Sequence, residues 1–467
     1  MYNKKKMREL IVSMHHSIPQ PRYGGPNHNC IVMGGPGYGK TRYFTEVNLA
    51  LMKGTSFIIN DSKGSLVKKY RGYLERMGYE VRVLNFARPG TDGHWNMFKY
   101  IRNEQDIMSI AHILTYLVEQ GQGNNKDPFW DEATQMRMAA FIAFCKEFVP
   151  KGKMTFPTLV FLLDNPMRLL DFVPGGKEKY EELEKEEKKA RSYDDCWGQI
   201  AAELGMSPSQ KNCLESRVFM ALSRLFPDSY ALKLYCRVAQ SPEKTWNTIR
   251  ITTFSKLGNF DAGGVQEMLS SDDVDIESIG DRKTALFVCV SDCDRALDPL
   301  ANIFYSQAIK VLEEHADNDC PENRLPIDVT FLFDDFATSV KIDDFPRMIA
   351  AFRSRGMSAI LLLQCESQLE SFYSPSDAKA IIACCSTYVY LGTMDLPTAQ
   401  NMSKRMNVPL EKAMNVPEGM CYVHHQGMKP FMDELFDTAA MEKELGISQP
   451  LEAARPEEPV AHEKDAA

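Results

Sequence analysis

A glycine-rich loop directly follows an apolar run in the segment CIVMGGPGYGKTRYF, residues 30–44. The order Gly34-x4-Gly39-Lys40-Thr41 fits the phosphate-loop pattern G-x-x-x-x-G-K-[ST], and it stands between a predicted strand and a predicted helix, as that pattern requires. In such a loop, backbone N–H groups face phosphate oxygens, the lysine reaches the outer phosphates and the threonine hydroxyl faces Mg2+. A glycine-rich turn without a ligand is the competing interpretation. We expect a nucleoside triphosphate to be held by Gly34, Gly35, Gly37, Tyr38, Gly39, Lys40, Thr41 and Arg42.

Two adjacent acids end another apolar run, DVTFLFDD. A phosphate loop needs a carboxylate that holds the metal at the end of a neighbouring strand. We expect Asp334 to hold Mg2+ and Asp335 to orient or deprotonate the attacking water. The alternative is that two aspartates merely end a strand.

Further polar residues surround the run SAILLLQ. Gln364 at its end could sense the γ-phosphate or position water, although a polar residue that merely ends a strand is a close alternative. Arg353 and Arg355, in AAFRSRG just before the run, could act as arginine fingers on the nucleotide of a neighbouring subunit. Surface arginines that interact favourably with a helix dipole explain the pair equally well. The residues alone leave this choice open.

The composition is that of a globular protein with a sizeable core, since 44% of its 467 residues are hydrophobic. No window approaches the roughly 20 apolar residues that a membrane helix needs, and no apolar signal core follows the basic start. The formal charge of -9 argues against a protein that coats nucleic acid over its whole surface, but it allows a local basic channel. The twelve cysteines form no C-x-x-C pair, so we expect reduced thiols and a cytoplasmic location, with no disulfide framework, no zinc site and no metal at CYVHH.

Short β-branched runs alternate with helix-length segments at both ends of the chain, which predicts an α/β fold with a mainly parallel sheet. Between them, apolar residues recur at spacings of three and four, as in amphipathic helices. We therefore expect a lead segment at 1–28, a nucleotide-binding domain in two parts at 29–103 and 246–447, an all-α insertion at 104–245 and a disordered acidic tail at 448–467.

Taken together, the motifs resemble one family in order and spacing. The resemblance is carried by GGPGYGKTRYF, NDSKGSL, YEVRVLNF with HWNMFKYI, DPFW, ALFVCVSDCD, FLFDDFA and FRSRGMSAILLLQ, which span about residues 29–435. These blocks are similar to the TraG/TraD-type conjugative coupling ATPases of type IV secretion systems. They resemble most closely the form common in Gram-positive conjugative elements.

This resemblance implies a RecA-like P-loop NTPase domain interrupted by an all-α domain, assembled as a homo-hexamer at the cytoplasmic membrane. It implies ATP and Mg2+ as cofactors, and single-stranded DNA, relaxase or relaxosome proteins and secretion channel proteins as partners. The family's phosphate loop falls on residues 34–41, its Mg2+ acid on Asp334, its sensing glutamine on Gln364 and its boundary arginine on Arg353 or Arg355. The all-α domain would contact the DNA-processing complex.

Three positions depart from the family's pattern. Asp335 replaces the usual Glu and is shorter by one methylene, and misplacement of about 1 Å can cost about a hundredfold in rate. DSKGS at 61–65 replaces DPKGE and lacks its acid. The usual N-terminal membrane segments are missing, so we expect a truncated chain or one tethered by a partner at the inner face of the membrane, with KKKMR close to it.

Three functions follow as hypotheses. The first is a motor that uses ATP to drive single-stranded DNA with its attached protein towards a membrane channel. The second is a nucleotide-binding docking platform that turns over slowly because of Asp335 and recruits relaxase or effector proteins. The third is a related P-loop ATPase that acts on protein or duplex DNA, against which the HWNMFKYI, DPFW and FRSRG blocks weigh by analogy.

Overall fold

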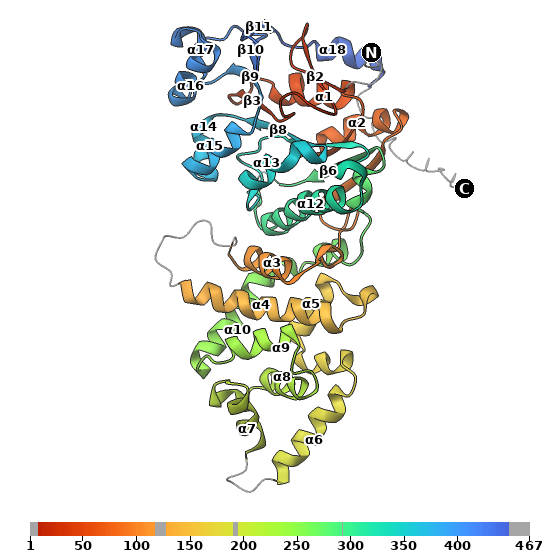
Figure 1. Ribbon diagram of the computed structural model, residues 1–467, viewed down its shortest axis with the longest axis vertical. Coiled ribbons are helices and arrows are strands. Elements are labelled where there is room, and N and C mark those ends of the chain that lie inside the picture. The colour runs from red at the N-terminus through yellow and green to blue at the C-terminus, as the bar shows by residue number, and fades with distance from the viewer. Residues whose placement is uncertain (1–7, 117–127, 190–194, 292, 448–467) are drawn as a thin grey trace, which may run out of the picture.

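The computed structural model of the chain describes residues 8–116, 128–189, 195–291 and 293–447 (Figure 1). The tail expected at 448–467, most of the basic stretch KKKMR and Asp127 of the DPFW block lie outside the described residues. A sheet flanked by helices forms one end of the molecule, and a purely helical body forms the other (Figure 1).

Within the described ranges, nine strands form the main sheet in the order β11-β10-β9-β3-β8-β7-β4-β6-β5. The seven strands from β9 to β5 run parallel, while β10 and β11 are antiparallel at one edge. The strands are β3 (Cys30–Gly34), β4 (Thr55–Asn60), β5 (Glu80–Asn85), β6 (Thr284–Cys289), β7 (Asp328–Phe333), β8 (Met357–Leu363), β9 (Thr387–Gly392), β10 (Met420–His425) and β11 (Phe431–Glu434). The mainly parallel sheet predicted from the apolar runs is therefore present.

The central strands are buried on both faces, which is why they read as continuous apolar runs. Alternate side chains enter two separate cores: Ile31 and Met33 pack into one, and Cys30 and Val32 into the other. Helices cover both faces because each core must be closed from water. Other groups can therefore reach the sheet where its strands begin and where they end. We call these its amino edge and its carboxyl edge.

Different helices cover the two faces. One face carries α1 (Glu46–Leu51), α2 (Ser65–Arg76), α18 (Thr438–Leu445) and the hairpin of β1 (Arg8–Ile11) and β2 (Ser17–Gln20). The other face carries α12 (Asp298–Asn318), α13 (Phe345–Arg355), α14 (Glu366–Phe372) and α15 (Pro375–Ala383), with α16 (Leu396–Met406) and α17 (Leu410–Met414) near β9 and β10.

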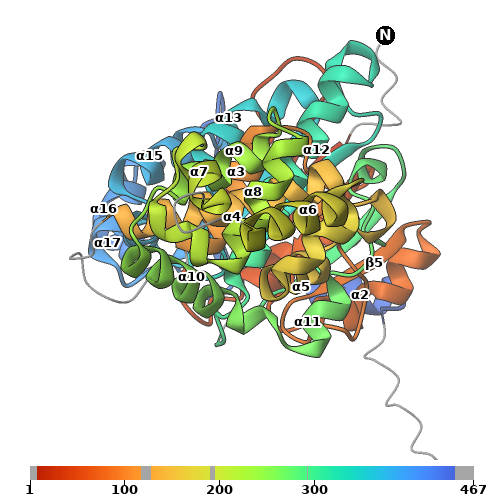
Figure 2. The same cartoon turned by 90° about the horizontal axis from the view of Figure 1, so that it is seen from below.

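The described residues between 104 and 283 contain no strand. They form α3 (Glu104–Tyr116), α4 (Pro128–Phe148), α5 (Phe156–Asp164), α6 (Gly176–Lys189), α7 (Cys196–Glu203), α8 (Leu214–Leu225), α9 (Tyr230–Val238), α10 (Glu243–Leu257) and α11 (Gly263–Met268). Seen from this end, the helical body lies in front of the middle of the sheet, with α16 and α17 to one side and α2 to the other (Figure 2). We refer to residues 104–268 as the helical body.

The helical body packs around α4, whose residues from Met138 to Cys145 are fully buried. Its core is continuous with the core under α12 on one face of the sheet. A fully buried ion pair lies inside it, in which the Arg137 guanidinium donates two hydrogen bonds to Glu215, at 3.1 and 2.7 Å. No described helix combines the length and apolarity needed to cross a membrane.

Candidate nucleotide-binding site

The glycine-rich loop connects the end of β3 to a short π-helical turn (Thr41–Thr45) that leads into α1. Gly37 and Gly39 have φ values of +80° and +76°, a backbone conformation that favours glycine. A Cβ at Gly39 would also lie 2.4 Å from the Tyr43 ring. The loop is fixed at its start because the Gly35 N–H donates to the carbonyl of Gly392, at the end of β9, over 3.0 Å.

Lys40 folds back over the loop that precedes it. Its Nζ donates to the carbonyls of Gly34 at 2.8 Å and Gly35 at 3.4 Å, and only 7% of its side chain is exposed. Burial lowers the pKa of Lys40, an effect that the neighbouring Asp335 and Asp334 carboxylates partly offset. The ammonium group is thus held at the loop by carbonyl oxygens that an incoming phosphate could replace.

Asp334 is brought to the loop from the end of β7. The Thr41 hydroxyl donates to its Oδ2 at 2.7 Å, while its main-chain carbonyl accepts from Asn60 Nδ2 at 2.9 Å. The other carboxylate oxygen, Oδ1, is buried and has no hydrogen-bond partner among the described residues. Burial raises the pKa of Asp334 to about 6, although the Thr41 hydrogen bond acts in the opposite direction. Thr41 and Asp334 offer only oxygen atoms, and one buried carboxylate oxygen is unused, which fits a hard cation such as Mg2+.

Asp335 lies on the solvent side of the same site. Its side chain is 42% exposed, and its Oδ1 lies 3.9 Å from Lys40 Nζ. The backbone has a φ of +50°, which is uncommon for a residue with a side chain and turns the chain sharply away from β7. The second acid therefore stands beside the loop without being buried in it.

Gln364 reaches the same edge of the sheet from β8. The parallel register pairs Met33 with Leu363, so Gln364 stands level with Gly34 at the start of the loop. Both strands end here, which places the glutamine, the loop and the two acids around one edge, as the sequence predicts.

Two residues that the sequence motif also suggested have different surroundings. The Tyr38 ring packs over Gly35 and Gly392, where a Cβ would lie 3.1 and 2.9 Å from it. The Arg42 Nε donates to Thr438 Oγ at 3.1 Å, which ties the turn after the loop to the start of α18. These contacts support the shape of the loop.

Asn60 was missed by the sequence reasoning. Besides the Asp334 carbonyl, its Nδ2 donates to Ser339 Oγ at 3.0 Å, so it joins β4 to the segment that carries both acids. A polar residue that ends the apolar run TSFIIN was the available signal. The departure DSKGS has a structural role, because the Asp61 carboxylate accepts from the N–H groups of Ser65 and Val67 at the start of α2.

The two candidate finger arginines lie at the opposite edge of the sheet. They occupy the last turn of α13, which ends where β8 begins, whereas the phosphate loop lies beyond the carboxyl end of β8. The seven residues of β8 separate these edges by roughly 20 Å. Within one chain, neither arginine is therefore brought to the loop.

The arginines also differ from each other. Arg355 forms an ion pair with Asp317 of α12, with Nη2 to Oδ2 at 2.6 Å and Nε to Oδ1 at 3.0 Å. Arg353 is exposed and lines a cavity of about 480 Å3 with Arg22, Glu322 and Arg324. No hydrogen bond or ion pair engages its guanidinium within the described ranges.

A family model for conjugative DNA transfer by type IV secretory systems matches residues 20–407, most of the chain. The chain belongs to this family. The predicted relationship to TraG/TraD-type coupling proteins is therefore confirmed. A search of curated proteins gave no match.

Solved structures of a coupling protein share the fold. The bacterial conjugative coupling protein TrwBdeltaN70 in complex with sulphate is 17% identical, with a TM-score of 0.58 over 92% of this chain and 90% of that chain. The plasmid coupling protein TrwB in complex with the ATP analogue ADPNP, and with ADP and Mg2+, gives TM-scores of 0.57 and 0.55 at 17% identity, each over 90% of this chain and 87% of the other. The predicted fold class, a RecA-like P-loop NTPase domain with an inserted all-α domain, is confirmed.

Proposed function

We propose that the chain is a coupling ATPase of conjugative type IV secretion that binds ATP with Mg2+ and drives relaxase-bound single-stranded DNA towards the transfer channel. The observation that carries this proposal is the hydrogen bond between Thr41 and Asp334, made beside a buried Lys40. It joins the phosphate loop to a metal-binding acid, and Asp334 Oδ1 is left with spare capacity. The nucleotides bound by TrwB, which has the same fold, support the same ligands here.

Each side chain then has a role that its position permits. The loop N–H groups and Lys40 would bind the phosphates, while Thr41 and Asp334 would provide the oxygen ligands for the metal. Mg2+ would neutralise charge on the outer phosphates. Asp335, exposed beside the loop, orients or deprotonates the attacking water, and Gln364 positions it or senses the γ-phosphate.

In this proposal, the opposite edge of the sheet contacts the nucleotide site of a neighbouring subunit. Because Arg353 and Arg355 lie roughly 20 Å from the loop of their own chain, an arginine finger at this position would act on a nucleotide bound to another copy. We propose a closed homo-hexamer, as the family resemblance implies, with Arg353 as the finger and Arg355 held by Asp317. The free guanidinium of a finger adds positive charge to the transition state.

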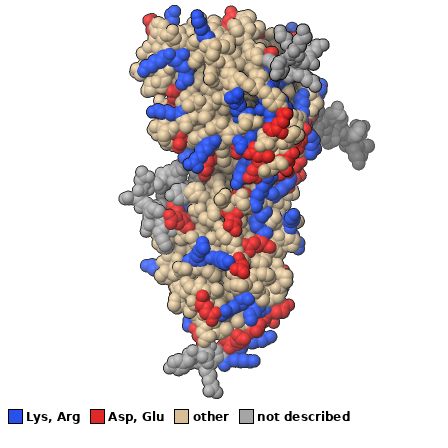
Figure 3. Space-filling model, in the orientation of Figure 1, with Lys and Arg blue, Asp and Glu red and all other residues tan. Residues whose placement is uncertain are grey.

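The partners belong to different parts of the chain in this proposal. The nucleotide-binding domain, residues 29–103 and 246–447, assembles the ring, and the all-α domain at 104–245 contacts the relaxosome. Basic and acidic side chains are interspersed along the face in Figure 3, so any DNA contact on this face would be local rather than spread over it. The ring would stand at the inner face of the cell membrane beside the channel proteins.

The test is phosphate release from ATP by the purified chain, with and without single-stranded DNA, using Lys40→Ala as the blank. We expect release that DNA stimulates and that the Lys40→Ala chain lacks. ATP binding with turnover no faster than the blank would contradict the motor. The short, exposed Asp335 then favours the slow docking platform, and Asp335→Glu would restore turnover if reach is the defect.

A further inference from the structure

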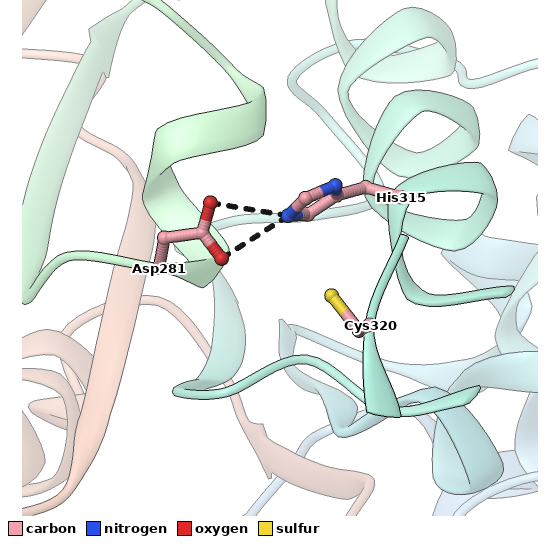
Figure 4. Close-up of side chains that lie close together, drawn as sticks. All are labelled: Asp281, His315 and Cys320. Atoms are coloured by element: carbon pink, nitrogen blue, oxygen red, sulfur yellow. Dashed lines mark hydrogen bonds and ion pairs between the residues drawn. The ribbon is translucent and has the colours of Figure 1, made fainter. Parts of the chain in front are cut away.

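An aspartate, a histidine and a cysteine from two separate segments converge at the amino edge of the sheet, away from the phosphate loop (Figure 4). Asp281 follows a 3-10 turn (Glu277–Gly280) that leads into β6. His315 lies in the last turn of α12, and Cys320 lies in the connection from α12 to β7. One ligand atom from each residue lies within 4.8 Å of the others.

His315 is oriented by a carboxylate on each side. Its Nε2 lies 3.1 Å from both oxygens of Asp281, and its Nδ1 lies 3.1 Å from Asp319 Oδ2, one helical turn further along. Metal-binding histidines commonly donate their second ring N–H to a carboxylate, which fixes the tautomer and the ring plane. Asp319 occupies that position, so Nε2 faces the cluster, and its hydrogen bond to Asp281 would give way to a bond to the metal.

The Cys320 thiol completes the group. Its Sγ points towards the space between Asp281 and His315 (Figure 4). Burial and the neighbouring Asp281 and Asp319 carboxylates raise the pKa of this thiol. A thiol in such surroundings stays protonated by itself, whereas coordination to a divalent cation would deprotonate it.

We propose that Asp281, His315 and Cys320 bind one zinc ion, with the fourth position open to solvent. Oxygen, nitrogen and sulfur ligands suit zinc, whereas Mg2+ and Ca2+ prefer oxygen alone. Zinc bonds of about 2.0–2.3 Å place tetrahedral oxygen, nitrogen and sulfur ligands roughly 3.3–3.7 Å apart. The Asp281 and His315 atoms, at 3.1 Å, are slightly closer than this, and the Cys320 Sγ lies within 4.8 Å of both, so shifts of about 1 Å bring the three atoms to zinc geometry.

The zinc ion would close the connection between α12 and β7 onto the turn before β6. This connection continues into Glu322, which lines the cavity that contains Arg353. Glu322 and Asn323 have φ values of +61° and +53°, so the turn is held in a backbone conformation that few side chains adopt. Zinc would thereby fix the connection that lines the cavity beside Arg353, independently of nucleotide binding.

The competing explanation is an ion pair. Burial alone would lower the pKa of His315, but the hydrogen bonds that its ring donates to the Asp281 and Asp319 carboxylates raise this pKa overall, so a protonated imidazole between two carboxylates is also stable. Cys320 would then play no part. The two explanations differ in whether a thiolate binds a metal, and that difference can be measured directly.

The experiment uses the full chain without a histidine tag, stripped of metal by a chelator, and titrates it with Co2+ and then Zn2+. We expect one Co2+ per chain with a thiolate-to-cobalt charge-transfer band in the near ultraviolet, which Zn2+ displaces. Metal bound at the phosphate loop gives no such band, because Thr41 and Asp334 contribute only oxygen. A wild-type chain without the band overturns the proposal.

Variants assign the ligands. Cys320→Ser should abolish the band, whereas the matched control Cys384→Ser, a half-buried cysteine at the end of α15, should keep it. Asp319→Asn should weaken Zn2+ binding by about 10–100-fold without removing the band. If Cys320→Ser fails to fold, Asp281→Asn at the exposed ligand serves instead and should weaken binding while its circular dichroism stays native. A band of equal strength in Cys320→Ser and wild type contradicts the site.

Discussion

The sheet end and the helical body both bury charged side chains, but they do so in opposite ways. At the phosphate loop, Lys40 is held by main-chain carbonyls, and Asp334 keeps one buried oxygen without a partner. In the helical body, Arg137 and Glu215 pair directly through two hydrogen bonds at 0% and 1% exposure, with Arg250 at 3.5 Å from Glu215, although Arg137 Nη1 has no hydrogen-bond partner among the described residues. Buried charge therefore indicates a ligand site where no opposite charge pairs with it directly, as at Asp334, and a single unpartnered polar atom does not by itself indicate one.

The largest expected effect is the loss of stability when the ion pair between Arg137 and Glu215 is broken. Glu215→Leu leaves the Arg137 guanidinium buried without a carboxylate, so we expect the free energy of unfolding to fall by about 3–5 kcal/mol. Three of the four tryptophans, Trp130, Trp197 and Trp246, lie in the helical body, so fluorescence during urea unfolding reports on it.

A double variant provides the control. Arg137→Met combined with Glu215→Leu removes both charges, and we expect it to recover most of the lost stability, because an apolar pair of similar volume can replace a buried ion pair. A loss below about 1 kcal/mol in the single variant would show that the pair is not closed to water.

A change at Asp334 should lower the rate of ATP turnover. Asp334→Asn keeps the hydrogen bond to Thr41 within reach but removes the charge that would hold the metal, so we expect ATP turnover to fall by about 100-fold or more. The helical body should remain folded, as judged by the same tryptophan fluorescence. Turnover within a few-fold of wild type would mean that another group holds the metal.

The candidate site at the phosphate loop could be predicted from sequence because its signals are local. A loop pattern, an acid pair and a glutamine each end an apolar run, and parallel strands bring their ends to one edge, whatever the strand order. The same reasoning places Arg353 and Arg355, which precede β8, at the other edge. The phosphate loop and its acids thus required no knowledge of which strands are neighbours.

Other contacts depend on tertiary neighbours that local patterns do not encode. Asn60 supports Asp334 only because β4 lies beside β7, and Arg137 meets Glu215 across two helices. The convergence of Asp281 with His315 and Cys320 is equally hidden, since its spacing matches no zinc pattern. Pairings between distant segments are therefore where the sequence reasoning stopped.

A smaller effect concerns pH. Burial raises the pKa of Asp334 to about 6, from an ordinary value of 3.8, so the folded chain holds this proton more tightly than the unfolded chain. The carboxyl therefore costs nothing below about pH 4, and stability falls by about 1–3 kcal/mol as the pH rises to about 6. Unfolding by urea at several pH values should show that Asp334→Asn lacks this loss.

Asp433 provides a control of opposite sign. Burial acts to raise the pKa of Asp433, but the hydrogen bonds that its carboxylate accepts from Ser13, His16 and His15 lower this pKa overall. Its contribution is therefore present above about pH 4 and is lost as the pH falls further. If Asp334→Asn and wild type show the same pH profile between about 4 and 6, the Asp334 carboxyl is not desolvated in the nucleotide-free chain.

The smallest effect compares one hydrogen bond at each end. Asn60→Ala removes the donor to the Asp334 carbonyl and to Ser339, and Ser229→Ala removes the cap of α9, whose Oγ accepts from the Leu232 N–H at 3.2 Å. We expect each to cost about 1 kcal/mol in urea unfolding. Only Asn60→Ala should also slow turnover per folded chain, because only Asn60 positions a group that faces the nucleotide. Equal turnover in the two variants would mean that β7 places Asp334 without help from β4.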